Sequence, residues 1–287
     1  MTSRRIAALI ATMGVLLLAT LHGSNAAFSA KDPETASFSA AGDFNDLSRL
    51  SGVSAPASAS LVWWLDSAKA TTVFADSACT TPSSVGGSVQ CWADRRPGRS
   101  KLVATTAAQR TSTTIAGHAP IRFAGMARMA GPDLLASTGS VTIYLVVREN
   151  VRMQNMVFSL NGDATANYGR FTLHPPWTDG TVYFDPGDVL GNRARTPINS
   201  MTTGIPALIA AWKDPVEARN HVQVDRKQIF DSTGFTVAAT SGGLRLGAVG
   251  TIGANHDLAE VLVFSSTLSQ TDRYHIAQYL QTKWGTP

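Results

Sequence analysis

The stretch HPPWTDGTVYFD, residues 174–185, gathers side chains that are suited to binding a small polar ligand. His174, Trp177, Asp179 and Tyr183 surround two consecutive prolines and a glycine. An aromatic surface beside a few polar groups is the usual composition of a ligand site. In one interpretation Trp177 and Tyr183 stack on sugar rings, while His174 and Asp179 form hydrogen bonds to the sugar. In the other, Trp177 fills the edge of the core and Asp179 caps a turn.

Acidic residues close to this stretch could hold a calcium ion. Hard cations need several oxygen ligands. Asp163, within NGDATAN, and the pair Asp185 and Asp188 supply carboxylates from expected loops. Asp and Asn also populate ordinary turns, and no fixed-spacing calcium motif is present. Calcium is therefore a candidate cofactor, with Asp163, Asp185 and Asp188 as its candidate ligands.

Glu260 interrupts the apolar run LAEVLVF, residues 258–264. A carboxylate in such a run is not expected to be buried without a partner. We expect a salt bridge, with Arg122 as its partner, or hydrogen bonds to the backbone. The alternative is a general acid with a raised pKa, but the same strand offers no second carboxylate to work with it.

Short strands must position these residues, because β-branched and aromatic runs recur and are separated by Gly, Asn, Asp and Pro. Several runs alternate between apolar and polar residues, which indicates one buried and one solvated face. Without helices between the strands, the pattern predicts a closed or two-sheet antiparallel architecture. The runs are 61–66, 141–147, 156–160, 169–174, 181–185, 206–212, 221–225, 243–249 and 258–264.

One amphipathic helix is expected at the C-terminus, from about Gln270 to Lys283. Ser269 is a suitable N-cap with Asp272 three residues later, and Gly285 supplies the stop. The apolar residues recur at helical spacing, so we expect Leu280 and Trp284 to pack the helix on the strands.

Cys79 and Cys91 are the two cysteines of the chain. In an exported protein an even count predicts a disulfide, here around a turn-forming segment rich in Gly and Ser. The alternative, a two-thiol metal or redox site, lacks a CxxC motif and a nearby histidine.

The N-terminus has the composition of a secretory signal peptide. A basic start, Met1–Arg5, precedes the apolar run Ile6–Leu21 and a small-residue segment. We expect cleavage after Ala26, with Ala27 or Ala30 as alternatives, and a retained anchor as the competing interpretation. The predicted location is secreted, at the cell surface or in the extracellular matrix, with no membrane span after cleavage.

A Ser- and Ala-rich segment follows, and the large apolar residues become frequent only at Leu61. The predicted organisation is a signal peptide at 1–26, an arm or linker at 27–60 and one domain at 61–287. Loss of the signal lowers the formal charge from +4 to about +2. No dense Lys/Arg run is present, so nucleic acid is not an expected partner.

The closing stretch LAEVLVFSSTLSQTDRYHIAQYLQTKWG resembles the last strand and helix of bacterial LamG-like domains, in the concanavalin A-like lectin/glucanase superfamily. The opening LVWWLD…CWADRR, the strand IRFAG at 121–125 and the stretch 174–185 are similar to the same family. This resemblance implies an all-β fold, a two-sheet antiparallel jelly-roll sandwich. A shorter stretch, AAFSAKDPETASFSAAGDF, resembles camelysin-like and biofilm-fibre secreted proteins.

The resemblance also bears on catalysis, because some members of the superfamily cleave glucans with the carboxylates of an E-x-D-x-x-E pattern. That pattern is absent, and so are HExxH and GxSxG. Asp185 and Asp188 lie in DPGD, whose proline and glycine predict a turn. The expectation is a non-catalytic domain that binds glycan or another surface polymer. The alternatives are an adhesive protein with protein partners and, least favoured, a glycanase.

Overall fold

The computed structural model describes residues 47–135, 139–160, 168–188, 191–235 and 243–287. The chain divides into a unit from Met1 to Phe44, outside the described residues, and a compact unit from Asn45 to Pro287. The predicted signal peptide therefore lies outside the described residues. The compact unit begins before Leu61 and includes part of the segment that was expected to be an arm.

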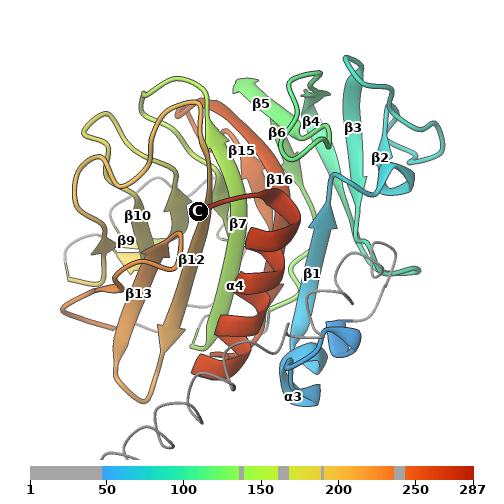
Figure 1. Cartoon of the computed structure of the whole chain (residues 1–287). Coiled ribbons are helices and arrows are strands. Elements are labelled where there is room, and N and C mark those ends of the chain that lie inside the picture. Colours follow the sequence, from blue (N-terminus) through green and yellow to red (C-terminus); the bar gives the residue numbers. More distant parts are fainter. Residues whose placement is uncertain (1–46, 136–138, 161–167, 189–190, 236–242) are drawn as a thin grey trace, which may run out of the picture. The chain divides into compact units, whose positions relative to one another are not determined.

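The compact unit is all-β with one C-terminal helix, α4 (Gln270–Trp284), as the sequence predicted. In the described residues, sixteen strands join one sheet, and the strand pairs are antiparallel (Figure 1). The strands are β1 (Leu61–Asp66), β2 (Val73–Phe74), β3 (Ser88–Ala93), β4 (Lys101–Arg110), β5 (Ile121–Gly125), β6 (Arg128–Ala130), β7 (Val141–Glu149), β8 (Phe158–Ser159), β9 (Tyr168–His174), β10 (Tyr183–Asp188), β11 (Ala194–Arg195), β12 (Pro206–Asp214), β13 (Arg219–Val224), β14 (Phe230–Asp231), β15 (Arg245–Gly247) and β16 (Ala254–Phe264).

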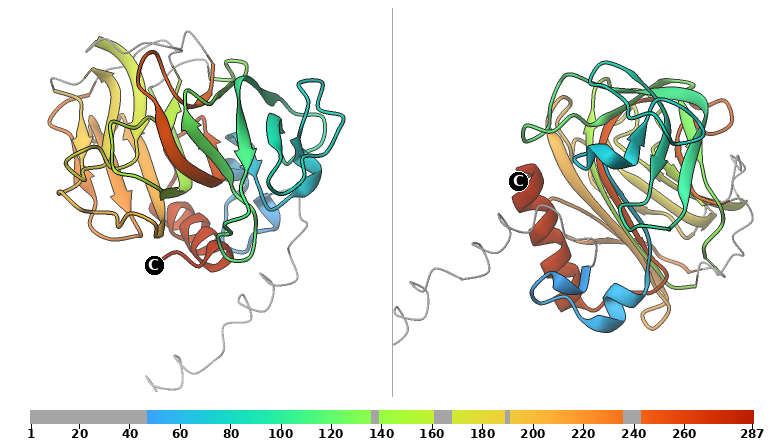
Figure 2. Two further views of the ribbon diagram at one scale, coloured as in Figure 1. Left: turned by 90° about the horizontal axis from the view of Figure 1, so that it is seen from above. Right: turned by 90° about the vertical axis from the view of Figure 1, so that its right-hand side faces the viewer.

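The predicted jelly roll of two separate sheets is corrected by this topology. Strand β5 pairs with β4 on one side and with β16 on the other, so the hydrogen-bonded ladder is continuous. The sheet curls around its own core and is barrel-like (Figure 2). A period-2 sequence pattern gives the buried face of each strand but not its neighbours, so it could not distinguish these architectures.

The two ends of the curled sheet meet without a shared backbone ladder among the described strands. Strands β10 and β11 lie against β13 and β14. The Asn220 side chain donates to the Asn192 carbonyl oxygen at 2.9 Å, and Lys213 Nζ donates to the Pro186 carbonyl oxygen at 3.3 Å. Side-chain hydrogen bonds therefore connect the ends of the sheet.

The core fills the inside of this curled sheet with apolar side chains from almost every strand. Phe171 of β9 and Phe184 of β10 meet edge to face with their centroids 5.5 Å apart. Burial of this kind is the main stabilising contribution to a domain of this size.

Strand β16 organises the sheet. It pairs with β7 along one side, and on the other side with β5 through Ala254–Leu258 and with β1 through Glu260–Phe264. The register shifts between Leu258 and Glu260, and such a bulge redirects the side chains that follow it. Leu258 therefore belongs to the core, whereas Glu260 turns to the outer face, beneath α4.

Helix α4 lies on the outer face of the sheet against β7 and β12 (Figure 1). Ser269 caps it by accepting from the Asp272 backbone N–H at 3.1 Å, and Gly285 ends it in the left-handed conformation, φ 62°. Leu280 and Trp284 are buried, as the helical pattern predicted.

A buried carboxylate fastens this helix to the sheet. Glu260 Oε2 accepts from Lys283 Nζ and Trp284 Nε1, each at 2.6 Å. Its Oε1 accepts from Trp64 Nε1 at 2.6 Å and from the Tyr279 hydroxyl at 3.0 Å. The expectation of a paired Glu260 is confirmed.

Arg122, however, is not the partner of Glu260. Arg122 binds Asp257, which Arg148 also contacts from the neighbouring strand. The prediction assumed unbroken alternation along β16, and the bulge invalidates that assumption.

A second carboxylate, Asp66, belongs to the same group of charges; we call Glu260, Asp66, Arg95 and Lys283 the Glu260 cluster. Asp66 is the register partner of Glu260 and binds Lys283 Nζ at 2.7 Å and the guanidinium of Arg95. Two carboxylates and two cations therefore share one buried volume with balanced charge. Burial and the neighbouring Asp66 raise the pKa of Glu260, and Lys283 opposes that rise.

The segment before β1 is also attached to α4. It contains a 3-10 turn, η1 (Leu47–Arg49), and a short helix, α3 (Ala55–Ala59). The Ser54 backbone N–H donates to Asp272 at 2.7 Å, and the Ser54 hydroxyl donates to the same carboxylate at 3.0 Å. Asp272 thus connects the N-terminal segment with the first turn of α4.

The predicted disulfide is confirmed, with Cys79 and Cys91 bonded and their Cα atoms 5.5 Å apart.

The predicted turn at DPGD is wrong, because Asp185–Asp188 continues β10. Pro186 is tolerated there because β11 pairs only with Tyr183 and Phe184, so the missing N–H of Pro186 interrupts no ladder on that side.

Among the residues that the structure describes, no helix combines the length and apolar composition needed to cross a bilayer.

Two short 3-10 turns were not anticipated from the sequence: η2 (Ala70–Thr72) and the turn η1 described above.

We predict that Glu260→Ala lowers the free energy of unfolding by about 3–5 kcal/mol, because it leaves buried donors and a lysine without their acceptor. Urea unfolding of the purified protein measures this change. Asp133→Asn, which removes an exposed negative charge but keeps the oxygen that accepts from the Leu135 backbone N–H, is the control and should change stability by no more than about 0.5 kcal/mol. Equal effects of the two substitutions would show that the Glu260 cluster does not stabilise the fold.

Candidate functional site

Strands β9 and β10 present the residues of the stretch 174–185 on two different faces. His174 is the register partner of Tyr183, and Phe184 is the partner of Leu173. Phe184 and Leu173 belong to the core, so His174 and Tyr183 lie on the outer face of this pair of strands. Of the two adjacent aromatic residues of β10, Phe184 therefore belongs to the core and Tyr183 does not.

The connection between the strands is a tight turn. The Gly180 backbone N–H donates to the Trp177 carbonyl oxygen at 2.7 Å, and the Trp177 N–H donates to the Thr181 carbonyl oxygen at 2.9 Å. Gly180 has a φ of 78°, and a Cβ there would lie 2.4 Å from Arg152 and 2.7 Å from Asn199. Only glycine fits this position, which fixes the path of the turn.

The four predicted ligand-binding residues come together with an arginine that follows β10. The Trp177 ring meets the His174 ring edge to face at 5.0 Å, and the Tyr183 hydroxyl donates to Asp179 at 2.6 Å. The Arg193 guanidinium lies 4.3 Å from the centre of the Tyr183 ring. We call His174, Trp177, Asp179, Tyr183 and Arg193 the rim cluster.

Exposure differs among the members of the rim cluster. Asp179 is exposed, Trp177 and Tyr183 are partly exposed, and His174 is buried beneath them. Trp177 is outside the core cluster, although Asp179 does cap the turn by accepting from the Thr181 N–H at 2.9 Å. The expected capping of the turn by Asp179 is therefore confirmed, whereas Trp177 does not belong to the core. Ligand binding by these residues stays a prediction.

His174 is held at both ring nitrogens. Nδ1 lies 3.1 Å from the Asn155 carbonyl oxygen, and because that oxygen can only accept, Nδ1 carries a proton. Nε2 is 3.1 Å from the Thr172 hydroxyl and 3.4 Å from Asp185. The imidazole is therefore a fixed support for Trp177.

Asp185 connects His174 to Arg193 within the rim cluster. Its two oxygens bind Arg193 in a bidentate pair, at 2.5 and 2.8 Å. This pairing positions Arg193 over Tyr183, and a calcium ion at Asp185 would have to compete with it. Asp163 and the side chain of Asp188 lie outside the described residues, so the calcium prediction stays a prediction.

Burial and hydrogen bonding shift the pKa values of Tyr183 and Asp179, the two groups of the rim cluster that are joined by a hydrogen bond. Burial raises the pKa of the Tyr183 hydroxyl, and its hydrogen bond to Asp179 raises it further. Slight burial acts to raise the pKa of Asp179, but the hydrogen bonds from Tyr183 and Thr181 outweigh it, so this pKa is lowered. Asp179 is therefore an ionised acceptor at neutral pH, and Tyr183 is a neutral donor.

Arg193 and Asn155 were not anticipated from the sequence. Arg193 lies eight positions after Asp185 on the returning side of a short hairpin, and this spacing of opposite charges could have indicated the pair. Asn155 gave no such signal, because its role depends on strands that are distant in sequence.

Asn155 also connects the site to the centre of the sheet. Its Oδ1 accepts from the Asn255 backbone N–H at 3.0 Å and lies 3.1 Å from Nδ1 of His256. His256 is buried and stacks on Phe123, with ring centroids 5.5 Å apart. This burial lowers the pKa of His256 to about 3.

No protein-family model matches the sequence, and no curated protein sequence matches it. Solved sialidase structures do share its fold. A Trypanosoma rangeli sialidase mutant that displays trans-sialidase activity aligns over 82% of this chain and 35% of its own, at 12% identity and a TM-score of 0.55.

Two further sialidases are similar. The T. rangeli sialidase in complex with 2,3-difluorosialic acid, described as a covalent intermediate, has 13% identity and a TM-score of 0.51 over 79% of this chain and 34% of its own. A mutant of the NanB sialidase from Streptococcus pneumoniae has 14% identity and a TM-score of 0.41 over 47% of this chain and 23% of its own. This chain thus spans about a third or less of the length of these sialidases.

These neighbours correct the expectation of a non-catalytic domain. The proteins whose fold this chain shares are glycosidases, so the classification as a non-enzyme is overturned. The comparisons do not confirm the LamG-like and camelysin-like resemblances. They support an all-β fold that occurs in carbohydrate-processing proteins.

The depressed pKa of His256 predicts acid sensitivity. Below its ordinary pKa of about 6.5 the unfolded chain binds a proton that the folded protein does not bind until about pH 3. Between these pH values, falling pH therefore favours unfolding, by up to about 1.4 kcal/mol per pH unit from this residue.

His256→Gln should remove this component, so that the free energy of unfolding falls less steeply between pH 6 and pH 4 than in the unmodified protein. Urea unfolding at several pH values measures the slope. His118→Gln, at an exposed histidine, is the control and should leave the slope unchanged. Parallel slopes for the unmodified protein and His256→Gln would contradict the prediction.

Proposed function

We propose that this protein is a carbohydrate-active protein that engages a saccharide at the rim cluster. The observation that carries the proposal is the pair of partly exposed aromatic rings, Trp177 and Tyr183, fixed beside charged groups on one face of β9 and β10. Aromatic faces bind the apolar faces of sugar rings, and the flanking polar groups bind hydroxyls and carboxylates. The rigid support from His174 and Asp185 limits the entropy lost on binding.

Sialic acid is the first saccharide to test. The T. rangeli sialidases that share the fold include one solved with 2,3-difluorosialic acid. A saccharide carboxylate suits a site that contains Arg193, because its guanidinium has more N–H donors than the two that bind Asp185. The whole activity of those longer proteins is not carried over, since this chain corresponds to 34–35% of their length.

A second candidate function at the same place is glycoside cleavage. Tyr183 and Asp179 form a hydroxyl–carboxylate hydrogen bond of 2.6 Å at the solvent-facing side of the turn. Tyrosine is the nucleophile of sialidases, and a carboxylate in this position can accept the phenolic proton as the tyrosine oxygen bonds to the anomeric carbon. The glycosidic C–O bond breaks in that step, the departing oxygen takes a proton from water, and a second water then releases the sugar from the tyrosine. Because the pKa of Tyr183 is raised, attack requires proton transfer to Asp179 in the same step.

An exported location fits a protein that meets glycans outside the cell. The signal-like sequence at 1–26 and the disulfide between Cys79 and Cys91 support export, because disulfides persist in oxidising compartments. We include export in the proposal.

We predict that Trp177→Ala abolishes retention on immobilised sialylated glycans while reducing stability by only about 1–2 kcal/mol. The stability loss should be below the 3–5 kcal/mol typical of a fully buried aromatic, because Trp177 is partly exposed and lies outside the core. Affinity chromatography with free sialic acid as competitor and a thermal melt measure the two quantities. Undiminished retention in Trp177→Ala would refute binding at the rim cluster.

For cleavage, we predict release of sialic acid from a sialylated substrate by the unmodified protein and at least a hundredfold slower release by Tyr183→Phe, which removes only the attacking oxygen. Retention on the glycan column should persist in Tyr183→Phe, because the ring remains. No release by the unmodified protein, or equal rates for both proteins, would refute cleavage at Tyr183 and leave the binding proposal to its own test.

A further inference from the structure

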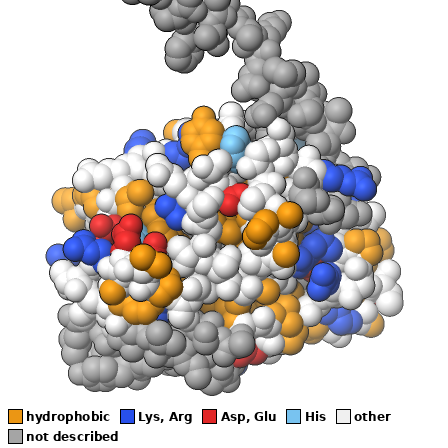
Figure 3. Space-filling model, turned by 90° about the horizontal axis from the view of Figure 1, so that it is seen from below, with side chains coloured by type: hydrophobic (Ala, Val, Ile, Leu, Met, Phe, Trp, Pro, Cys, Tyr) orange, Lys and Arg blue, Asp and Glu red, His pale blue; other side chains and the backbone are white. Residues whose placement is uncertain are grey.

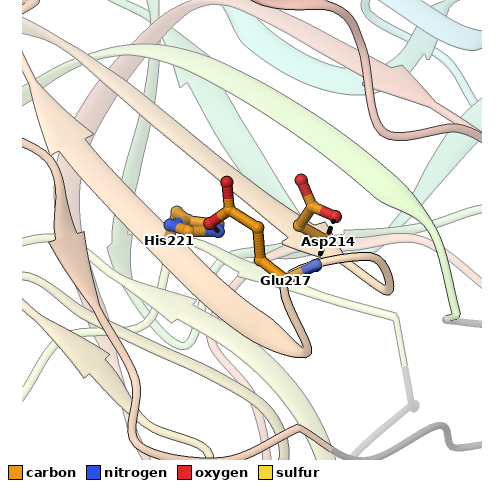
Figure 4. Close-up of side chains that lie close together, drawn as sticks. All are labelled: Asp214, Glu217 and His221. Carbon is orange, nitrogen blue, oxygen red and sulfur yellow. Dashed lines mark hydrogen bonds and ion pairs between the residues drawn. The ribbon is translucent and has the colours of Figure 1, made fainter.

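A group of potential metal ligands lies at the turn between β12 and β13, apart from the rim cluster. Asp214 ends β12, Glu217 belongs to the turn, and His221 follows on β13. Figure 4 shows the three side chains converging from the two arms of this hairpin. One ligand atom of each residue lies within 4.8 Å of the others.

The ring of His221 has one nitrogen without a hydrogen-bond partner. The residue is only 4% exposed. Its Nε2 is buried and neither accepts nor donates a hydrogen bond. Nε2 lies 3.4 Å from Glu217 Oε2 and points into the cluster (Figure 4). Such an unsatisfied buried polar atom is costly, so it requires an explanation.

The other nitrogen of His221 explains how Nε2 is oriented. Nδ1 lies 2.6 Å from Asp231 Oδ1, and Asp231 is the register partner of His221 on β14. An ionised carboxylate can only accept, so Nδ1 carries the proton and the Nε2 lone pair faces Glu217 and Asp214. Trp212 stacks on the imidazole at 4.9 Å and 18°, which fixes the plane of the ring.

Asp214 is positioned by the turn itself. Its Oδ1 accepts from the backbone N–H groups of Val216 at 2.9 Å and Glu217 at 3.2 Å. The carboxylate is therefore held in place, while the Glu217 side chain is 59% exposed and can adjust to an ion. The site has two fixed ligands and one adaptable ligand.

The charges at this place favour a cation. Among the described residues no lysine or arginine forms an ion pair with Asp214 or Glu217, while Arg219 pairs with Asp231 at 3.5 Å. The molecular surface seen from below carries acidic side chains gathered beside basic ones (Figure 3). Arg273 lies over the Trp212 ring at 4.4 Å and interacts electrostatically with Asp214 and Glu217 without forming an ion pair with either among the described residues.

We infer that Asp214, Glu217 and His221 form a binding site for a divalent transition-metal ion of the zinc class. One imidazole nitrogen and two carboxylate oxygens are a donor set that zinc accepts, with a fourth position left for water or an external ligand. Calcium and magnesium prefer oxygen ligands alone, so the imidazole argues against them. Asp231 would act as the carboxylate that orients a metal-bound histidine through its second nitrogen.

This inference does not rest on the proposed function. The ligands belong to β12, β13 and their turn, whereas the rim cluster belongs to β9, β10 and the residues that follow each of them. An ion here would join the β12–β13 turn to β14 through His221 and Asp231. Failure of metal binding would leave saccharide binding unaffected, and the reverse also holds.

The test is isothermal titration of the metal-free protein, purified without a histidine tag, with zinc chloride. We expect saturable binding of one zinc ion per chain and a rise in melting temperature on zinc addition. Calcium chloride at the same concentrations should produce neither effect. Absence of saturable zinc binding, or a preference for calcium, would overturn the inference.

Variants separate this site from adventitious binding. Glu217→Gln changes an exposed side chain, so the fold should persist while zinc affinity falls strongly, and His221→Gln should abolish binding. Asp231→Asn should weaken affinity by about 10–100-fold through the orientation of His221. Asp133→Asn, at an exposed carboxylate elsewhere, is the matched control and should bind as the unmodified protein does. Zinc binding that survives in both Glu217→Gln and His221→Gln would refute the assignment.

Discussion

The buried carboxylate of Glu260 is the interaction on which the arrangement of the outer face depends. Four donors from two elements converge on its two oxygens: Trp64 of β1, and Tyr279, Lys283 and Trp284 of α4. A charge in this position is tolerable only because every lone pair has a partner and because Asp66, Arg95 and Lys283 balance the total charge. The same network therefore specifies both the docking of α4 and the pairing of β1 with β16.

The bulge in β16 makes this network geometrically possible. Before it, Leu258 faces the core while the strand pairs with β5. After it, Glu260 faces α4 while the strand pairs with β1. One irregularity therefore lets a single strand serve two neighbours and lets a carboxylate leave the core side of an apolar run.

The rim cluster and the proposed metal site use a common device with different outcomes. In each, a buried histidine is fixed through Nδ1, by the Asn155 carbonyl oxygen for His174 and by Asp231 for His221. At His174 the second nitrogen meets Thr172 and Asp185, so the ring is a satisfied support for an aromatic residue. At His221 the second nitrogen has no hydrogen bond, so the ring is available as a ligand. The difference in chemistry arises from the groups opposite Nε2, which are a hydroxyl and a carboxylate at His174 and the carboxylates of the β12–β13 hairpin at His221.

The sequence by itself determined the class of fold, most strand positions, the C-terminal helix with its Ser269 cap and Gly285 stop, and the disulfide. These depend on local periodicity, capping chemistry and the count of cysteines, which are readable within a few residues. It also indicated that His174, Trp177, Asp179 and Tyr183 lie near one another, because they share one turn. Only the tertiary structure decided that the sheet is continuous and barrel-like, that DPGD is strand, and that Glu260 binds α4 rather than Arg122. Arg193, Asn155 and Asp231 likewise gain their roles from partners brought together by strand pairing. Register shifts and edge positions arise from contacts between distant segments, and a single sequence carries no local signal for them.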